Sequence, residues 1–145
     1  MIVVFDLDNT LADEYGQTLR PGIVEFLERL TREEHTLILW TQSQRSRAQG
    51  ILKHHDLSRF FKQCLFREDY DPGNAYPPKD IRRVKGDVLI DDSPAHIAYI
   101  RSIGLKGVLV ESYRGRPLNR ADELDAIYRE MQPKGWLKSL FGKGR

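Results

Sequence analysis

Short apolar runs alternate along this chain with longer segments of helical periodicity, and this order limits the possible folds more than any other feature. The runs are rich in branched and aromatic residues and predict strands at 2–5, 36–40, 63–66, 88–90 and 107–110. Helical periodicity covers 21–33, 43–55, 94–103 and 120–131. Strands that are apolar on both faces belong to a parallel sheet covered by helices. The sequence therefore predicts an α/β fold, a Rossmann-like five-stranded parallel sheet sandwiched by helices.

Length and composition fit one domain followed by a basic tail. The chain has 145 residues, of which 40% are hydrophobic and 30% charged, as is ordinary for globular proteins. We expect a domain over 1–132 and a basic amphipathic tail over 133–145. The tail contains no acidic residue, and its apolar side chains can share one helical face. Its basic residues are Lys134, Lys138, Lys143 and Arg145, and its apolar residues are Trp136, Leu137, Leu140 and Phe141.

The composition of the tail is compatible with several binding partners. Its apolar face is expected to dock on the domain's own core or on a second subunit, and contact with a membrane surface or nucleic acid is the less favoured alternative. The N-terminus lacks the basic and long apolar regions of a signal peptide, and no apolar stretch reaches the length of a membrane span. With Cys64 as the single cysteine, these features predict a cytoplasmic protein.

Acidic and hydroxyl residues follow three of the predicted strands. Asp6 and Asp8 come after the first strand, Thr41 after the second, and Asp91 and Asp92 after the fourth. A lone pair of aspartates is common in turns, so the pair alone would be weak evidence. However, the carboxyl ends of parallel strands meet at one edge, where open α/β sheets bind ligands. We therefore expect these side chains to lie together.

A lysine and the chemistry of phosphate complete this prediction. Lys79 precedes the fourth strand by about one short helix, so the connection can return its ammonium group to the same edge. Phosphoryl transfer requires cations and hydrogen-bond donors around the phosphoryl oxygens. Asp6, Asp8 and Asp92 offer the oxygen ligands that Mg²⁺ prefers. One carboxylate can then attack phosphorus, and another can donate a proton to the leaving group and later accept one from water.

In order and type, these residues closely resemble the motifs of the haloacid dehalogenase superfamily of phosphatases. The resemblance covers about 2–110 and begins with DLDNT after the first strand. It implies that Asp6 is the nucleophile, that Asp8 is the general acid and base, and that the main-chain carbonyl of Asp8 also reaches the metal.

The same resemblance implies roles for the later residues. Thr41, Gln42 and Lys79 are the expected phosphate-binding residues. Asp92 is the expected metal-binding carboxylate, and Asp91 would support it or the lysine from outside the site. The order of roles within this acidic pair stays open.

A narrower resemblance and the short connections bear on the substrate. DLDNTL, RPGIVEFL, LILWTQS and VLIDDSP are similar to small phosphatases that act on the RNA polymerase C-terminal domain and to the magnesium-dependent phosphatase group. The first group usually has Asn at the position of Asp92, so the carboxylate favours the second. Residues 11–20 and 69–78 are too short for a cap domain. An uncovered site can admit a phosphoprotein or a nucleic-acid end, with Tyr15, Tyr70 and Tyr76 as candidates for its rim or as ordinary surface and core residues.

The sequence thus predicts a magnesium-dependent phosphatase that hydrolyses phosphomonoesters through an aspartyl-phosphate at Asp6. The alternative from another class is a phospho-ligand binding module that has the pocket without turnover. A response-regulator receiver would place its acidic pair early and its lysine late, which is the reverse of the order here. No glycine-rich GxxxxGK[ST] loop occurs, which argues against a nucleotide kinase.

Overall fold

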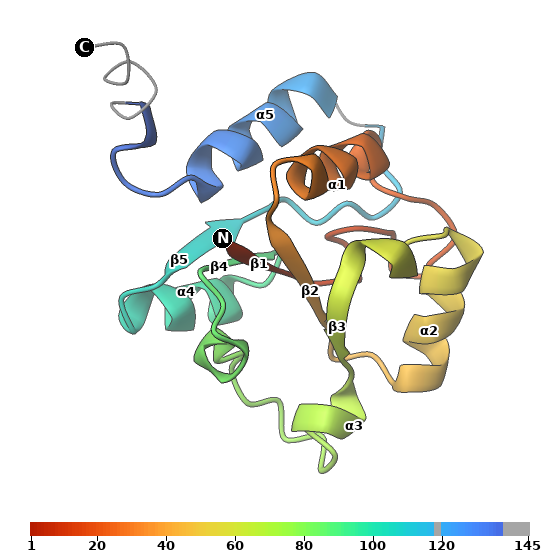
Figure 1. Cartoon of the computed structure of the whole chain (residues 1–145). Helices are drawn as coiled ribbons and strands as arrows, with labels where there is room; N and C mark the ends of the chain where they lie inside the picture. Colours follow the sequence, from red (N-terminus) through yellow and green to blue (C-terminus); the bar gives the residue numbers. More distant parts are fainter. Residues whose placement is uncertain (118–119, 138–145) are drawn as a thin grey trace.

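The computed structural model describes residues 1–117 and 120–137, which form a five-stranded sheet with helices on both faces (Figure 1). The strand order is β3-β2-β1-β4-β5, and every neighbouring pair is parallel. The α/β prediction is therefore confirmed. The strands are β1 (Ile2–Phe5), β2 (Thr36–Trp40), β3 (Phe61–Leu65), β4 (Val88–Asp91) and β5 (Lys106–Leu109).

The helices follow the alternation of the sequence. From β1 the chain passes to β2 and β3 on one side, and then returns to the other side of β1 for β4 and β5. Strand order therefore reverses between β1 and β4, the place where open α/β sheets form their ligand crevice. The helices are α1 (Ile23–Arg32), α2 (Arg45–His54), α3 (Arg67–Tyr70), α4 (Pro94–Ser102) and α5 (Arg120–Met131), with two 3₁₀ helices, η1 (Ser58–Phe60) and η2 (Ile81–Val84).

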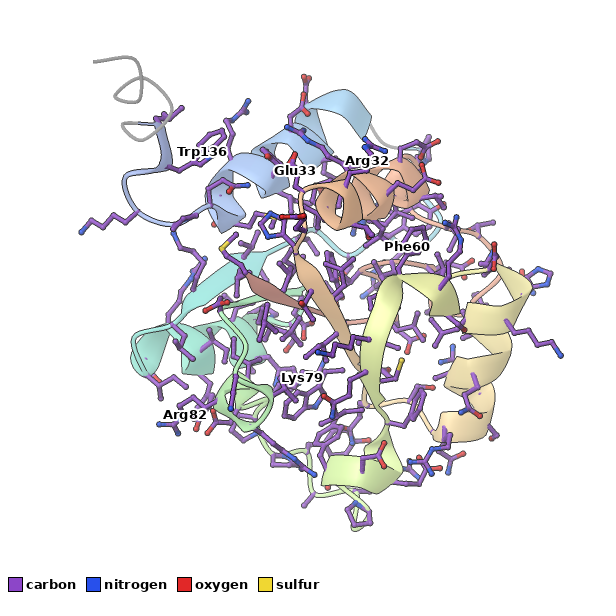
Figure 2. All side chains as sticks on the ribbon, viewed as in Figure 1. Arg32, Glu33, Phe60, Lys79, Arg82 and Trp136 are labelled. Atoms are coloured by element: carbon purple, nitrogen blue, oxygen red, sulfur yellow. The ribbon has the colours of Figure 1, made fainter. Side chains whose placement is uncertain are left out.

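Two hydrophobic layers hold the sheet in place. Alternate residues of a strand point to opposite faces, so Val3 and Phe5 of β1 join one layer and Val4 joins the other. The first layer lies under α1, α2 and α5, and the second lies under α4 and η2. Side chains fill both layers (Figure 2). Burial on both faces explains why the strands read as continuous apolar runs rather than as alternating ones.

Several boundaries differ from the sequence prediction. β3 begins at Phe61 rather than at residue 63, because it is an edge strand in which the exposed Lys62 separates Phe61 from the rest of the run. α1 begins at Ile23, since Gly22 has a φ of 81°, a conformation that ends the preceding turn rather than starting a helix at Pro21. A short helix, α3, occupies part of the expected loop at 69–78.

The connections contain no cap domain. The segment after β1 forms only isolated bridges, from Ala12 to Asp8 and to Leu19. After α3 the chain runs through turns to η2. Among the described residues, no helix is both long enough and apolar enough to cross a membrane.

The start of the expected tail packs onto the domain. Trp136 is partly buried against the first hydrophobic layer, and its ring centre lies 5.9 Å from that of Tyr128 on α5 (Figure 2). Leu137 is exposed. The other tail residues of the sequence prediction, Lys138, Leu140, Phe141, Lys143 and Arg145, lie outside the described residues. Docking on the protein's own core, the first of the expected roles, thus has one contact in its favour.

Candidate active site

The loop after β1 holds Asp6 at the carboxyl edge of the sheet. The Asp6 N–H donates to the carbonyl of Ile90 on β4 at 3.1 Å, which fixes Asp6 at the point where strand order reverses. The carbonyl of Leu7 then accepts the N–H groups of Thr10, Leu11 and Ala12, and these bonds curl the chain into a tight loop. Asp6 is only 8% exposed, so its carboxylate depends on protein groups for its partners.

Lys79 lies between two carboxylates in the packed interior (Figure 2). Its Nζ donates to Asp6 Oδ1 at 2.9 Å and to Asp91 Oδ2 at 2.8 Å. The side chain is 2% exposed. Burial opposes the charge, but the attraction of Asp6 and Asp91 outweighs it and raises the pKa of Lys79 above its ordinary value. The ammonium group is therefore a permanent cation of this site.

Burial raises the pKa of Asp6 to about 6. The nearby Lys79 works against this rise, and the negative charge of Asp91 adds to it. Asp92 behaves in the same way, because burial raises the pKa of its carboxyl above the ordinary value. Carboxylates thus outnumber the ammonium group here, and a further positive charge would stabilise their ionised forms.

Three carboxylates converge at this edge. Asp6, Asp91 and Asp92 each offer an oxygen, and these oxygens lie within 4.8 Å of one another. Thr10 Oγ1 donates to Asp6 Oδ2 at 3.1 Å and lies 3.4 Å from Asp92 Oδ1, so it connects the two side chains. Ser112 Oγ donates to Asp92 Oδ2 at 2.6 Å. A cluster of hard oxygen donors with excess negative charge suits Mg²⁺.

The two members of the acidic pair differ in their bonds. Asp91 accepts from Lys79 through Oδ2 and from the N–H of Ser93 through Oδ1. Both of its oxygens are therefore used to hold the lysine and the start of α4. Asp92 is half-buried; it accepts from the hydroxyl of Ser112, and its Oδ1 lies 3.4 Å from the hydroxyl oxygen of Thr10. This difference favours Asp92 as the direct metal ligand and Asp91 as the residue that orients Lys79.

Asp8 lies beside this cluster, and its carboxylate is not one of the three that converge. Arg47 of α2 contacts it, with Nη1 donating to Oδ2 at 3.2 Å and Nη2 lying 2.9 Å from Oδ1. The side chain faces the mouth of the site and is 31% exposed. Of the side chains predicted to bind the metal, Asp6 and Asp92 therefore come together, and that of Asp8 is directed elsewhere.

The two residues after β2 have different surroundings. Thr41 is fully buried, and its Oγ1 accepts the N–H of Ser43 at 3.0 Å, which leaves its hydroxyl proton for another acceptor. Gln42 is turned toward the 70s loop, where Nε2 donates to Asp71 Oδ2 at 2.6 Å and Oε1 accepts from the hydroxyl of Tyr70. The Thr41 hydroxyl thus keeps its proton for another acceptor, whereas the Gln42 amide is already bonded to Asp71 and Tyr70.

The three tyrosines that were candidates for the rim of the site differ in their exposure to solvent. Tyr15 and Tyr76 are exposed. Tyr70 packs its ring 5.2 Å from that of Trp40, and burial raises the pKa of its hydroxyl to about 12. Tyr70 therefore packs against the second hydrophobic layer, whereas Tyr15 and Tyr76 lie at the surface.

Several residues of the site were not identified from the sequence. Arg20 is almost completely buried and donates to the carbonyls of Thr10 at 2.6 Å and Asn9 at 2.9 Å, which fixes the loop after Asp6. Ser112 and Arg47 come from distant elements and carry no motif. Thr10 had a usable signal, because it is the last residue of the DxDxT pattern.

Comparisons with known proteins agree on family and fold. A family model described as NLI interacting factor-like phosphatase matches residues 1–132. Similar solved structures include a putative beta-phosphoglucomutase from Thermotoga maritima (TM-score 0.63, 17% identity, 97% of this chain and 98% of that chain). A D,D-heptose 1.7-bisphosphate phosphatase from B. bronchiseptica, complexed with magnesium and phosphate, is another (TM-score 0.60, 17% identity, 90% and 97%).

A third similar solved structure is a putative haloacid dehalogenase-like hydrolase from Bacteroides fragilis (TM-score 0.61, 16% identity, 86% of this chain and 92% of that chain). At these identities the structures establish a shared fold. The search of curated proteins returned no match.

Proposed function

We propose that this chain, which belongs to the NLI interacting factor-like phosphatase family, hydrolyses phosphomonoesters through a covalent phosphate on Asp6 with Mg²⁺ bound beside it. The observation that carries the proposal is the position of Asp6. Its buried carboxylate lies between the ammonium of Lys79 and the Thr10 hydroxyl, and within 4.8 Å of oxygens from Asp91 and Asp92. Such an arrangement orients a nucleophile and surrounds it with charge that a phosphoryl group can balance.

Asp6, Asp92 and, by the family resemblance, the main-chain carbonyl of Asp8 would hold Mg²⁺. When bound, the ion supplies the positive charge that lets a carboxylate approach a phosphate. Lys79 and the free hydroxyl proton of Thr41 would bind phosphoryl oxygens. Asp91 keeps Lys79 in place through the 2.8 Å bond.

The reaction then has two steps. In the first, an Asp6 oxygen bonds to phosphorus, the ester bond breaks, and Asp8 gives its proton to the leaving oxygen. In the second, Asp8 takes a proton from water as the water oxygen attacks phosphorus, which frees Asp6 and releases inorganic phosphate. The partly exposed Asp8 suits this role because it can reach both the leaving group and solvent.

Phosphate release from an aryl phosphate, measured with Mg²⁺ and with excess EDTA, tests this function. We expect activity that needs Mg²⁺ and falls at least about a thousandfold in Asp6→Asn, because the nucleophile is lost. Asp56→Asn, which changes an exposed aspartate, is the matched control and should retain activity. Metal-independent activity, or full activity of Asp6→Asn, would refute the proposal. Binding of phosphate without any beryllofluoride adduct at Asp6 would instead favour a binding module without turnover.

A further inference from the structure

Arg47 covers the side of the site that faces Asp8. Its Nη1 donates to Asp8 Oδ2 at 3.2 Å and to Ser43 Oγ at 2.9 Å. Its Nη2 donates to the carbonyl of Glu14 at 2.7 Å and lies 2.9 Å from Asp8 Oδ1. The side chain is 40% exposed, so the guanidinium group lies at the mouth of the site rather than inside it.

Arg47 contacts both carboxylate oxygens of Asp8. Asp8 Oδ1 is shielded from solvent and accepts no hydrogen bond from the part of the chain that the structure describes, because its contact with Nη2 is an ion pair without hydrogen-bond alignment. Oδ2 is bonded to Nη1. A leaving group that takes a proton from Asp8 therefore comes close to the guanidinium group and can share or replace its contacts.

The other contacts of Arg47 are easily exchanged. Ser43 Oγ and the Glu14 carbonyl are neutral acceptors near solvent, and water can replace both of them. A carboxylate or phosphate would instead make two charge-assisted hydrogen bonds to the planar fork of the guanidinium group. Lys79 cannot serve this purpose, since it is buried against Asp6 and Asp91.

We infer that Arg47 recognises an anionic group on the leaving group, and that the preferred substrates are phosphomonoesters whose leaving group carries a carboxylate or a second phosphate close to the ester oxygen. The inference rests on the proposed function, because the role of Asp8 defines the leaving-group side. Arg47 is thus a specificity residue, whereas Asp6 and Lys79 serve every phosphomonoester alike.

Matched substrates test this inference. Phosphoglycolate and 2-hydroxyethyl phosphate differ in the carboxylate, and propane-1,3-diol bisphosphate and 3-hydroxypropyl phosphate differ in the second phosphate. We expect wild type to prefer the anionic member of at least one pair by about tenfold or more in kcat/KM, and the pair concerned identifies the anion. In Arg47→Gln the preference should fall below about threefold, mainly through KM, and Arg47→Lys should be intermediate.

Arg45 provides the matched control. It lies two residues earlier in the first turn of α2 and is paired with Asp69, away from Asp8. Arg45→Gln should keep the wild-type preference. Equal kcat/KM within both pairs, or equal losses on the anionic and neutral members in Arg47→Gln, would overturn the inference while leaving the phosphatase function intact.

If no substrate is turned over, measurements of binding affinity test the inference about Arg47 instead. Calorimetry would then compare the same pairs on wild type and Arg47→Gln in Mg²⁺. Tighter binding of an anionic member that is lost in Arg47→Gln would support the inference, and equal affinities would overturn it. Absence of turnover with any phosphomonoester would refute the proposed function alone.

Discussion

Asp6 and Asp91 share one ammonium group, that of Lys79, and Asp92 lies close by, next to the hydroxyls of Thr10 and Ser112. At the scale of single residues, three carboxylates therefore lie close to a single ammonium group, and their negative charges repel one another. Burial and like charge both act against the ionised form of Asp6. If Asp6 is the nucleophile, as we propose, the approach of a cation and a phosphate would relieve this repulsion.

The first prediction concerns the pH dependence of stability in EDTA. The pKa of Asp6 in the folded protein is about 6, above the ordinary value of an aspartate, so the protonated form favours folding and the contribution of Asp6 to stability falls as pH rises from about 4 to 6. Asp6→Asn lacks this loss and should exceed wild type by about 1–3 kcal/mol at pH 7.5. Urea unfolding at pH 7.5 and 4.5 measures this, and an advantage that is the same at both pH values would contradict it.

The second prediction concerns Lys79. Lys79→Met removes the partner of two buried carboxylates and should lower the free energy of unfolding by about 3–5 kcal/mol at pH 7.5. The double variant Lys79→Met with Asp91→Asn should regain part of this loss, because one unpaired charge is gone. Neither variant should release phosphate. Full activity in the double variant would show that Lys79 has no role beyond pairing its neighbours.

At the scale of elements, Arg20 ties the loop after β1 to the rest of the fold. Its guanidinium group donates hydrogen bonds to the carbonyls of Asn9, Thr10 and Glu111. Its Nη1 also lies 2.5 Å from Glu123 Oε1 on α5. One buried side chain thus joins the loop of Asp6, the segment after β5 and the last helix. The position of Asp6 depends on this connection as well as on the sheet.

The third prediction follows from this connection. Arg20→Lys keeps the charge but loses the fork that reaches several carbonyls, so we expect kcat to fall at least about tenfold at temperatures where the variant is fully folded. Glu123→Gln, which changes only the partner of Arg20 on α5, is the control and should keep kcat within about twofold. Circular dichroism establishes folding in each case. A normal kcat in Arg20→Lys would mean that the sheet alone positions Asp6.

The sequence patterns were sufficient for the main elements. Because β1, β2 and β4 are buried on both faces, they appear in the sequence as continuous apolar runs. The positions of Asp6, Thr41, Lys79 and Asp92 relative to these runs predicted that the four residues lie at one edge of the sheet. The start of the edge strand β3 was predicted two residues late, because the exposed Lys62 separates Phe61 from the rest of the run. Arg20 and Arg47 escaped detection because a long cationic side chain has no periodic signal, and its partners are determined only by the packing of distant elements.

At the scale of the whole molecule, the described residues form a single layered unit with no cap over the carboxyl edge (Figure 1). The candidate metal ligands come from the two strands on either side of the topological reversal, β1 and β4. Binding of Mg²⁺ at this junction would therefore stabilise the complete fold rather than one part of it.

The fourth prediction tests this coupling. Mg²⁺ at a hundredfold excess over its Kd should stabilise wild type by about 2.7 kcal/mol and raise Tm. Asp92→Asn should lose this rise, since it removes the one carboxylate of the three that is not paired with Lys79. Asp91→Asn should retain more of it. Thermal unfolding at several Mg²⁺ concentrations measures the effect, and an equal rise in wild type and Asp92→Asn would place the metal elsewhere.

The separation of Asp6 and Asp92 along the chain also has a kinetic consequence. A folding intermediate that has paired β1 with β2 and β3 alone lacks Asp92, one of the three proposed ligands, so the proposed metal site is incomplete until β4 joins the sheet. Mg²⁺ should then act after the rate-limiting step of folding and slow unfolding while leaving the refolding rate unchanged. Stopped-flow unfolding and refolding in Mg²⁺ and in EDTA would separate the two rates, and a protein that loses its metal slowly would also resist proteolysis for longer.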